Sequence, residues 1–434
     1  MEWDEIIRKG IKRVDQVEIY EERSRIIVVD VEKGEIKRAE VSFSSGVGIR
    51  VLKGKRLGFA YGNTEAAEKI LEEAIKGCEA NREDPNLPGF APESRPSTVE
   101  GLFDSRLDEM EPEEVFDMVK AMVEASKISD KVYSVSASME VASTQITVIN
   151  SEGLDLTEKR TVISAGCYVS SRDGSRASTG SEIGEGRCLE SVDPERIGRT
   201  AGERAIASLN SVQAETGEYP MVILPRASPK FLGFLVGSAA NADNLQHGRS
   251  FLTGKLGTMI GREEISLIDD GLLAGRLGSR SFDDEGTPTG RTYVVREGVF
   301  ESAIYDRYTA HKEGRESTGN ARRSYSSIPS VERNNVVLSA DKISGDDVMD
   351  VKKGILLIST GDSPNLANGE FSGLISEGFL IENGEITKGL KGTNFCLNLL
   401  DLLKNVEVVG KEVRDIAGVI APPIRIRKVR IAGS

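Results

Sequence analysis

The two histidines of the chain, His247 and His311, set the first limit on its chemistry. A zinc hydrolase needs three protein ligands and an open coordination position, and histidine is the usual donor. The two residues are 64 positions apart (247 to 311), and neither has a neighbouring histidine or a glutamate in His-Glu-x-x-His register. The residues alone therefore favour ordinary surface or core histidines. A catalytic metal would need carboxylate ligands or a cluster that the fold assembles.

The sequence lacks the common motifs of nucleophilic and phosphate chemistry. It contains no Gly-x-Ser-x-Gly nucleophile elbow and no Gly-x-x-x-x-Gly-Lys-Ser/Thr phosphate loop. Cys396 stands between Phe395 and Leu397, and this apolar context predicts a buried, inert thiol. The acidic runs Asp269-Asp270 and Asp283-Asp284-Glu285 are predicted to be solvated charges in turns.

The densest group of polar side chains runs from Ser317 to Tyr325. Arg322 and Arg323 follow a Gly-Asn turn and supply planar donors that can hold a carboxylate or a backbone carbonyl. Gly319 would let a second chain approach closely. The alternative is a solvent-facing loop whose arginines pair with Glu313 or Glu316. Composition alone favours that alternative.

Charge and termini exclude several classes of partner. The 434 residues carry 56 Lys and Arg against 69 Asp and Glu, a formal charge of −13, which argues against a nucleic-acid partner. The start at Met1-Glu2-Trp3 lacks the basic and apolar regions of a secretory signal. The longest apolar run, 231–240, is about half a membrane span. With four cysteines and no Cys-x-x-Cys pair, we expect a cytoplasmic protein without a membrane partner.

The N-terminal elements are predicted from apolar alternation, glycine turns and helical spacing. A Pro-rich segment, 81–110, is predicted as a linker. The predicted strands are 17–19, 25–31, 36–43, 47–51, 132–140, 145–150 and 154–169. Three helices are predicted. The first runs from Asn63 or Thr64 to about residue 78, the second from 111 to about 127, and the third from 194 to about 209.

The order of strands followed by a helix occurs on both sides of this linker. Glycines near residues 46–54 recur near residues 166–174, at an offset of about 120 residues. We predict an N-terminal α/β domain over 1–215, with a duplication of 1–80 and 111–215 as one interpretation. The other interpretation is that any two meanders followed by a helix look alike.

From residue 218 to residue 434 the pattern predicts a mostly β domain, barrel-like or a sandwich, so the fold class is α+β. Asn383-Gly384 between two apolar runs is a strong hairpin signal. Near the C-terminus Ile424 and Ile426 are out of phase with Val429 and Ile431. A bulge at Arg427-Lys428 would keep all four aliphatic side chains on one face.

Four segments together resemble the TldD/PmbA family, whose members include cytosolic metallopeptidases once called modulators of DNA gyrase. The resemblance covers essentially the whole chain and implies a two-subunit assembly with an α/β N-terminal part and a large β C-terminal part. The segments are Phe282–Thr289, Ser317–Arg323, Gly378–Ile386 and Ile431–Gly433.

The resemblance also implies which branch of the family the chain follows. The catalytic branch, TldD, carries His-Glu-x-x-x-His on a helix and a zinc-binding cysteine near the C-terminus. The counterpart here is expected near Asn241–Leu252, which lacks the motif, and no cysteine follows Val406. This pattern matches the PmbA branch, also called TldE. We therefore predict no catalytic residue, metal ligand or cofactor in this chain, and zinc in a TldD-like partner.

The resemblance implies a non-catalytic subunit that encloses extended or unfolded peptides beside a TldD-like protease. Peptide or interface contacts are then expected at Thr318, Gly319, Asn320, Arg322 and Arg323. Two alternatives stay open at this point: a metallopeptidase with an unrecognised metal site, and a stand-alone peptide-binding or scaffold homodimer.

Overall fold

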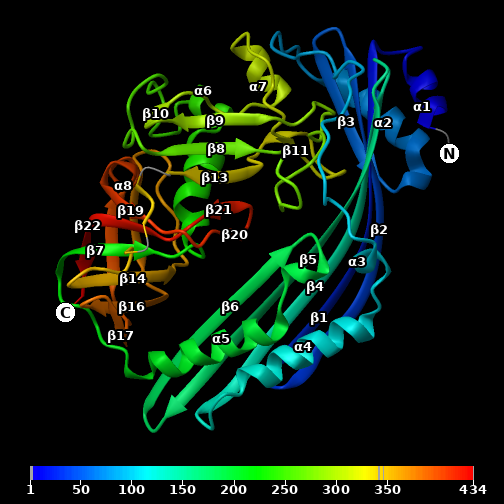
Figure 1. The fold of residues 1–434 in the computed structure, drawn as a ribbon. Coiled ribbons are helices and arrows are strands. Elements are labelled where there is room, and N and C mark those ends of the chain that lie inside the picture. The colour runs from blue at the N-terminus through cyan, green and yellow to red at the C-terminus, as the bar shows by residue number, and fades with distance from the viewer. Residues whose placement is uncertain (1–2, 341–342, 346, 434) are drawn as a thin grey trace.

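The computed structural model describes residues 3–340, 343–345 and 347–433. The chain forms a long, bent N-terminal sheet with helices on one face, and a C-terminal part built on shorter strands (Figure 1). The α+β fold class and the mostly β C-terminal part are confirmed. Within the part of the chain that the structure describes, no helix has the length and apolar content that a membrane crossing requires.

The N-terminal sheet has six antiparallel strands in the order β3-β2-β1-β4-β5-β6. Four of the strands contain 17 to 19 residues. The sequence had predicted shorter strands, interrupted at glycine and polar residues. There is no break because Ser24 pairs with Ser44 on one side and Thr144 on the other, so the ladders continue. The strands are β1 (Gln16–Glu32), β2 (Glu35–Lys53), β3 (Arg56–Gly62), β4 (Val132–Asn150), β5 (Asp155–Asp173) and β6 (Arg176–Gly186).

Helices cover one face of this sheet. The apolar residues at odd positions of β1, such as Ile19 and Ile27, face the helices, and their burial drives the packing. Pro112 and Pro194 begin two of the helices, where the missing amide has no cost. The helices are α1 (Trp3–Gly10), α2 (Ala67–Ala80), α3 (Ser105–Glu109), α4 (Pro112–Ser126) and α5 (Pro194–Ala207).

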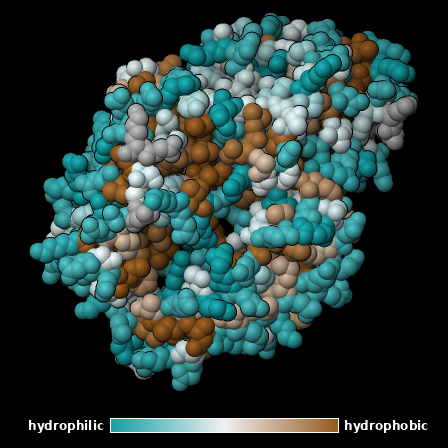
Figure 2. Space-filling view, in the orientation of Figure 1, coloured by the Kyte–Doolittle hydropathy of each residue, from teal (hydrophilic) through white to brown (hydrophobic). Residues whose placement is uncertain are grey.

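The opposite face of the sheet meets the C-terminal part at one end and is open at the other. Ile26, Val28, Ser138 and Ser164 line a cavity of about 570 Å³ on the open stretch. Figure 2 shows the molecular surface hollowed between the long sheet and the C-terminal part. Aliphatic and polar side chains therefore face an open groove along the sheet.

The proline-rich segment 81–104 lies across the junction of the two parts without regular structure. The Ser94 hydroxyl donates to the carbonyl of Gly286 at 3.1 Å, and the Ser97 hydroxyl donates to the carbonyl of Thr289 at 2.8 Å. This segment is thus packed on the C-terminal part.

Two larger sheets make up the C-terminal part, in the orders β10-β9-β8-β13-β21-β20 and β15-β18-β22-β7-β14-β16-β17, and β19 pairs with β22. A two-stranded sheet joins β11 and β12. The first group of strands is β8 (Ser266–Asp270), β9 (Arg291–Arg296), β10 (Val299–Phe300), β11 (Ala321–Arg322), β12 (Ser330–Val331), β13 (Asn335–Ser339), β20 (Arg414–Ile416) and β21 (Val419–Ala421). The second group is β7 (Gly217–Ile223), β14 (Lys353–Ser359), β15 (Glu370–Leu374), β16 (Glu377–Glu382), β17 (Glu385–Gly389), β18 (Asn394–Asn398), β19 (Val406–Val409) and β22 (Ile424–Ala432).

A π-helical segment, Pro229–Gly233 and Leu235–Ala239, shares one core with both sheets. Its buried residues Phe231 and Val236 pack in the same cluster as Ile223 of β7 and Val336 of β13. The remaining helices of this part are short: α6 (Ala242–Gln246), α7 (Arg307–Lys312) and α8 (Leu399–Asn405).

Two predicted local features are confirmed. Asn383 and Gly384 have positive φ angles of 51° and 83° and join β16 to β17. In β22 the register shifts between Ile426 and Val429, and the four aliphatic residues of the strand are all buried.

Candidate functional site

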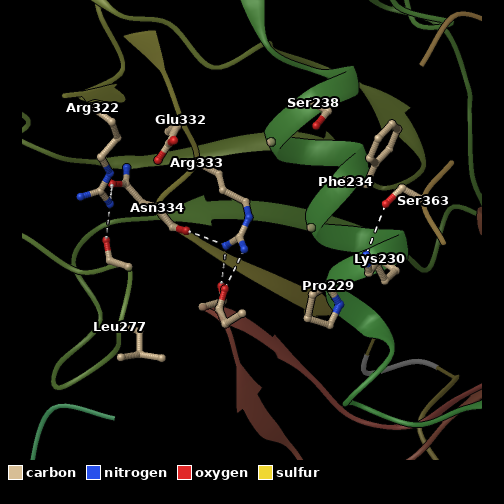
Figure 3. Close-up of a pocket in the computed structure, with 15 residues that line it drawn as sticks. Pro229, Lys230, Phe234, Ser238, Leu277, Arg322, Glu332, Arg333, Asn334 and Ser363 are labelled. Atoms are coloured by element: carbon tan, nitrogen blue, oxygen red, sulfur yellow. Dashed lines mark hydrogen bonds between the residues drawn. The ribbon is translucent and has the colours of Figure 1, made fainter. Parts of the chain in front are cut away.

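A cavity of about 660 Å³ lies beside the π-helical segment, and we call it the helix pocket (Figure 3). Five segments that are distant in sequence form its wall. The lining residues are Pro229, Lys230, Gly233, Phe234, Gly237, Ser238, Leu277, Gly278, Arg322, Glu332, Arg333, Asn334, Ser363, Ala417 and Gly418.

The π-helical hydrogen bonding decides which residues reach the helix pocket. In such a helix residues five apart lie about one turn apart and share a face, unlike in an α-helix. Gly233 and Ser238 are five apart, and both line the pocket together with Phe234. The opposite side of the segment is held in the core by Phe231 and Val236.

Arg333 lies across two glycines of this helix. A Cβ atom at Gly237 would be 3.1 Å from Cδ of Arg333, and one at Gly233 would be 3.6 Å from its Nε. The guanidinium donates to the carbonyls of Ala417 at 2.7 Å and Gly418 at 3.2 Å. The glycines therefore leave space that the arginine side chain fills.

The helix pocket carries an excess of positive charge. None of Lys230, Arg322 and Arg333 forms an ion pair with a carboxylate of the described residues, and the exposed Glu332 is the one acid in the lining. Burial lowers the pKa of Arg333, and the neighbouring acids oppose that shift. Lys230 donates to the Ser363 hydroxyl at 3.3 Å (Figure 3).

Three of the five predicted contact residues form a network inside the protein. Asn320 is 1% exposed, and its amide donates to Oδ2 of Asp269 at 2.8 Å. The Thr318 hydroxyl donates to the Asn320 side-chain oxygen at 2.6 Å. Gly319 has φ of +74°, and a Cβ there would lie 2.8 Å from the carbonyl oxygen of Pro288. The space at Gly319 is thus occupied by this chain's own backbone and not by a second chain.

The two arginines that follow diverge. Arg322 lines the helix pocket, where it donates to the carbonyl of Gly278 at 3.3 Å. The Arg323 side chain is 1% exposed, contacts Glu18 at 2.7 Å and stacks over the Tyr20 ring at 4.4 Å. Of the five predicted residues, Arg322 is the one that the structure places in this pocket. Neither arginine pairs with Glu313 or Glu316 as the loop alternative required.

The acidic runs are buried, which corrects the expectation of solvated turns. Asp269 and Asp270 belong to β8 and are each 1% exposed. Burial raises the pKa of Asp269 to about 6, although Asn320 and Asn334 donate hydrogen bonds that oppose the shift. Burial and the charge of Glu285 raise the pKa of Asp283 to about 7. These carboxylates hold loops together inside the protein.

Metal ligands do not gather anywhere in the residues that the structure describes. No group of three or more His, Cys, Asp or Glu side chains there could hold an ion. His247 is exposed at the end of α6 and contacts Asp243 at 3.2 Å, while His311 is exposed on α7.

Cys396 is exposed, not buried as its apolar neighbours predicted. It lies on β18, where successive side chains point to opposite faces, and Phe395 is the residue that faces the core.

Sequence reasoning missed Lys230, Gly233, Gly237 and Arg333. The only sequence signal for this pocket was the pair of glycines, four residues apart within an apolar run. Such glycines indicate that another part of the chain packs closely against the helix. The partner that approaches comes about 100 residues later, and nothing in the local sequence identifies it.

Comparison with known proteins assigns the chain to a family. Profiles of the PmbA/TldA metallopeptidase match three segments: domain 1 over residues 17–78, the central domain over 105–209, and the C-terminal domain over 216–433. The chain belongs to the PmbA/TldD metallopeptidase family. The expected resemblance is confirmed.

The similar proteins span nearly the whole chain. A metalloprotease of Methanothermobacter thermautotrophicus is 30% identical over 97% of this chain and 96% of its own length. A TldD homologue of Haemophilus influenzae is 25% identical over 98% of this chain and 94% of its own. Among solved structures, TldE of Thermococcus kodakarensis matches with a TM-score of 0.90 and 28% identity, covering 99% of this chain and all of the other.

Proposed function

We propose that this chain is the non-catalytic, TldE-like subunit of a two-subunit peptidase, and that it holds extended peptide beside a zinc-bearing TldD-like partner. One observation carries the proposal. Gly233 and Ser238 lie on the face of the π-helical segment where a His-Glu-x-x-x-His motif would present its histidines, and the Arg333 side chain lies over Gly233 and Gly237.

The helix register supports this placement of the missing motif. The two histidines of His-Glu-x-x-x-His are five residues apart, so a π-helix brings both to one face. Gly233, Phe234 and Ser238 have that spacing and line one pocket. The expected counterpart at Asn241–Leu252 fits less well, because α6 has only five residues. We therefore place the counterpart at 233–238.

The side chains at this position do not fit a zinc ion. Zinc in proteins is bound by Cys, His, Asp or Glu, and Gly233, Phe234 and Ser238 supply none of these. The fixed positive charge of Arg333 would also repel a divalent cation. Hydrolysis would then need the metal of a partner.

The helix pocket instead suits a peptide main chain. Lys230, Arg322 and Arg333 offer donors for carbonyl groups, and the exposed side of Phe234 offers an apolar contact. Because these donors have no carboxylate partner, a ligand can bind them and no ion pair has to break. A cavity of about 660 Å³ is in the range of pockets that bind small ligands or short peptide segments.

Association with a partner tests the proposal. The purified chain is mixed with the TldD-like subunit of the same genome, and the masses are measured by sedimentation velocity together with zinc by mass spectrometry. We expect a hetero-complex whose zinc belongs to the partner. Stoichiometric zinc in the isolated chain would favour a metallopeptidase, and a stable homodimer that ignores the partner would favour a stand-alone scaffold; both results contradict the proposal.

A further inference from the structure

A second cavity, of about 360 Å³, adjoins the helix pocket, and we call it the arginine pocket. Arg322 and Glu332 line both cavities, so the two are neighbours. Arg160, Arg280 and Arg323 complete a set of four arginines in its wall. They come from β5, the 280–284 loop and the turn after β11, so the pocket lies at the junction of the two parts of the molecule.

Three of these arginines each have one acidic partner and a spare donor. Arg280 contacts Asp284 at 3.1 Å, and Arg160 is paired with Glu158. Nevertheless Nη2 of Arg160, Nε of Arg280 and Nε of Arg323 are buried, and none has a hydrogen-bond partner among the described residues. A buried donor without a partner is unfavourable, and a ligand, an ion or a water commonly supplies the missing acceptor.

Arg322 is the fourth member and has no acidic partner. Its Nη2 contacts two neutral oxygens, the carbonyl of Gly278 at 3.3 Å and Oδ1 of Asn334 at 3.5 Å. It is half-buried at the boundary of the two pockets. Its charge is therefore available to an anion.

A further arginine lies near the pocket, and acids stand in its wall. Arg187 lies close by and forms no ion pair among the described residues; burial and repulsion from Arg160 and Arg280 lower its pKa to about 9. Glu22, an acid of the wall, has a raised pKa because it is buried. Both Asp284 oxygens are engaged, one by Arg280 and the other by the backbone amide of Arg323.

The mouth of the arginine pocket is polar and open. Ser327 and Ser330 line it and are exposed, and Ser324 is half-buried. Hydroxyl groups can donate to an entering oxyanion, and the volume of about 360 Å³ admits a carboxylate with one or two peptide residues.

We propose that the arginine pocket binds a carboxylate group of the peptide whose main chain lies in the helix pocket. Guanidinium groups hold carboxylates through paired, charge-assisted hydrogen bonds. Arg322, at the boundary, would contact both segments of one peptide. The choice of a peptide as the source of the carboxylate rests on the proposed function, whereas the affinity for carboxylate is a property of this chain alone.

Calorimetric titration of the isolated full-length chain tests the inference. The probe is an N-acetylated heptapeptide of small neutral residues with a free C-terminal carboxylate. It is compared with its C-terminal amide, with an amide carrying one internal glutamate, and with inorganic phosphate. We expect the free acid to bind at least about tenfold more tightly than the plain amide. Binding of the glutamate-containing amide would also support carboxylate recognition and would identify a side chain as its source.

Two variants locate the binding. Arg322→Gln removes the unpaired charge without opening an ion pair, and it should weaken free-acid binding at least about tenfold. Arg8→Gln removes an exposed arginine of α1 and should leave binding unchanged. Three results would overturn the inference. The first is equal binding of the free-acid peptide and its amide, and the second is binding of phosphate while neither the free-acid peptide nor the glutamate-containing amide binds. The third is free-acid binding that Arg322→Gln leaves unchanged. None of these results bears on assembly with a partner, which sedimentation measures separately.

Discussion

Arg323 and Glu18 meet where the long sheet touches the C-terminal part. Both side chains are almost fully buried, at 1% and 0% exposure. Arg50 donates to Glu18 at 2.8 Å and also contacts Glu285 at 3.3 Å, so the charges form one network across the junction. The burial of Glu18 opposes ionisation, but the two arginines outweigh it and lower the pKa of its carboxyl.

Removing Arg323 should therefore destabilise the protein strongly. Arg323→Met leaves Glu18 with one arginine instead of two and removes the stack on Tyr20. We expect the free energy of unfolding in urea to fall by about 1.5–3 kcal/mol, because the buried Glu18 carboxylate loses one of its two arginine partners while Arg50 remains. Arg315→Met, which removes an exposed pair with Glu313 at 3.5 Å, is the control and should stay near wild type. Equal effects of the two changes would contradict the role of the buried network.

Asp283 should make stability depend on pH. Its pKa in the folded protein is about 7, against 3.8 for an ordinary aspartate, because it is buried near Glu285. The folded state thus favours the protonated acid. This contribution is complete below pH 3.8 and is lost as the pH rises through about 7.

The Asp283→Asn variant isolates this effect, since asparagine does not titrate. The stability of the wild type relative to the variant should fall between pH 4 and 7, by up to about 1.4 kcal/mol per pH unit. Urea unfolding at several pH values measures the difference. A difference that is constant, or that grows with pH, would show that Asp283 is ionised throughout.

Sequence reasoning identified the polar density at 317–323 but could not say which side chains turn inward. Asn320 is buried and Arg322 lines the pocket, although only one residue separates them. Their environments depend on Asp269, which is 51 positions away, and on Asn334. The same limit applies to Glu285, whose partner Arg50 is 235 positions away. A window of local sequence contains none of these partners.

At the scale of elements, the long strand β2 carries the contact between the two parts. A Cβ at Gly48 would lie 2.4 Å from the backbone oxygen of Tyr325, and one at Gly46 would lie 2.4 Å from its ring. These glycines lie within a continuous strand because the segment after β11 packs directly on them. Gly46 lies in the predicted break between residues 43 and 47 and Gly48 in the predicted strand 47–51, but the sequence does not show the partner that packs on them.

Gly48→Ala should consequently weaken the junction. The methyl group meets backbone, which cannot rotate away, and we expect a loss of about 1–3 kcal/mol in the free energy of unfolding. Gly77→Ala is the matched control, because its Cβ meets nothing within 4 Å on α2. The control should stabilise by about 0.5–1 kcal/mol through helix propensity. A neutral or stabilising Gly48→Ala would contradict the close contact with Tyr325.

The sequence predicted well those helices and turns whose formation depends on residues that are close together in the chain. The helices α2, α4 and α5 lie where the apolar spacing and the prolines placed them. The hairpin at Asn383-Gly384 and the bulge before Val429 depend on neighbouring residues only. The π-helical segment contains the longest apolar run, 231–240, but that run does not indicate the π-type hydrogen bonds, which form where the segment packs between two sheets.

At the scale of the whole molecule, the open face of the long sheet, the helix pocket and the arginine pocket lie around the contact between the two parts. The chain belongs to a metallopeptidase family, and the proposed function assigns these surfaces to the walls of a peptide-binding chamber. The net charge of −13 leaves the positive pockets as local exceptions. Under the proposed function, these pockets and the Arg333 side chain over the glycines of the π-helical segment would hold substrate, and the partner would supply the metal that cleaves it.

The rate at which an unfolded peptide is cleaved tests whether this chain holds substrate for a catalytic partner. The rate is determined with this chain alone, with the zinc-loaded TldD-like subunit alone, and with both at equal concentration. We expect no cleavage by this chain, little by the partner, and a large increase for the pair. Cleavage by this chain alone, or full activity of the partner without it, would show that the proposed division of roles is wrong.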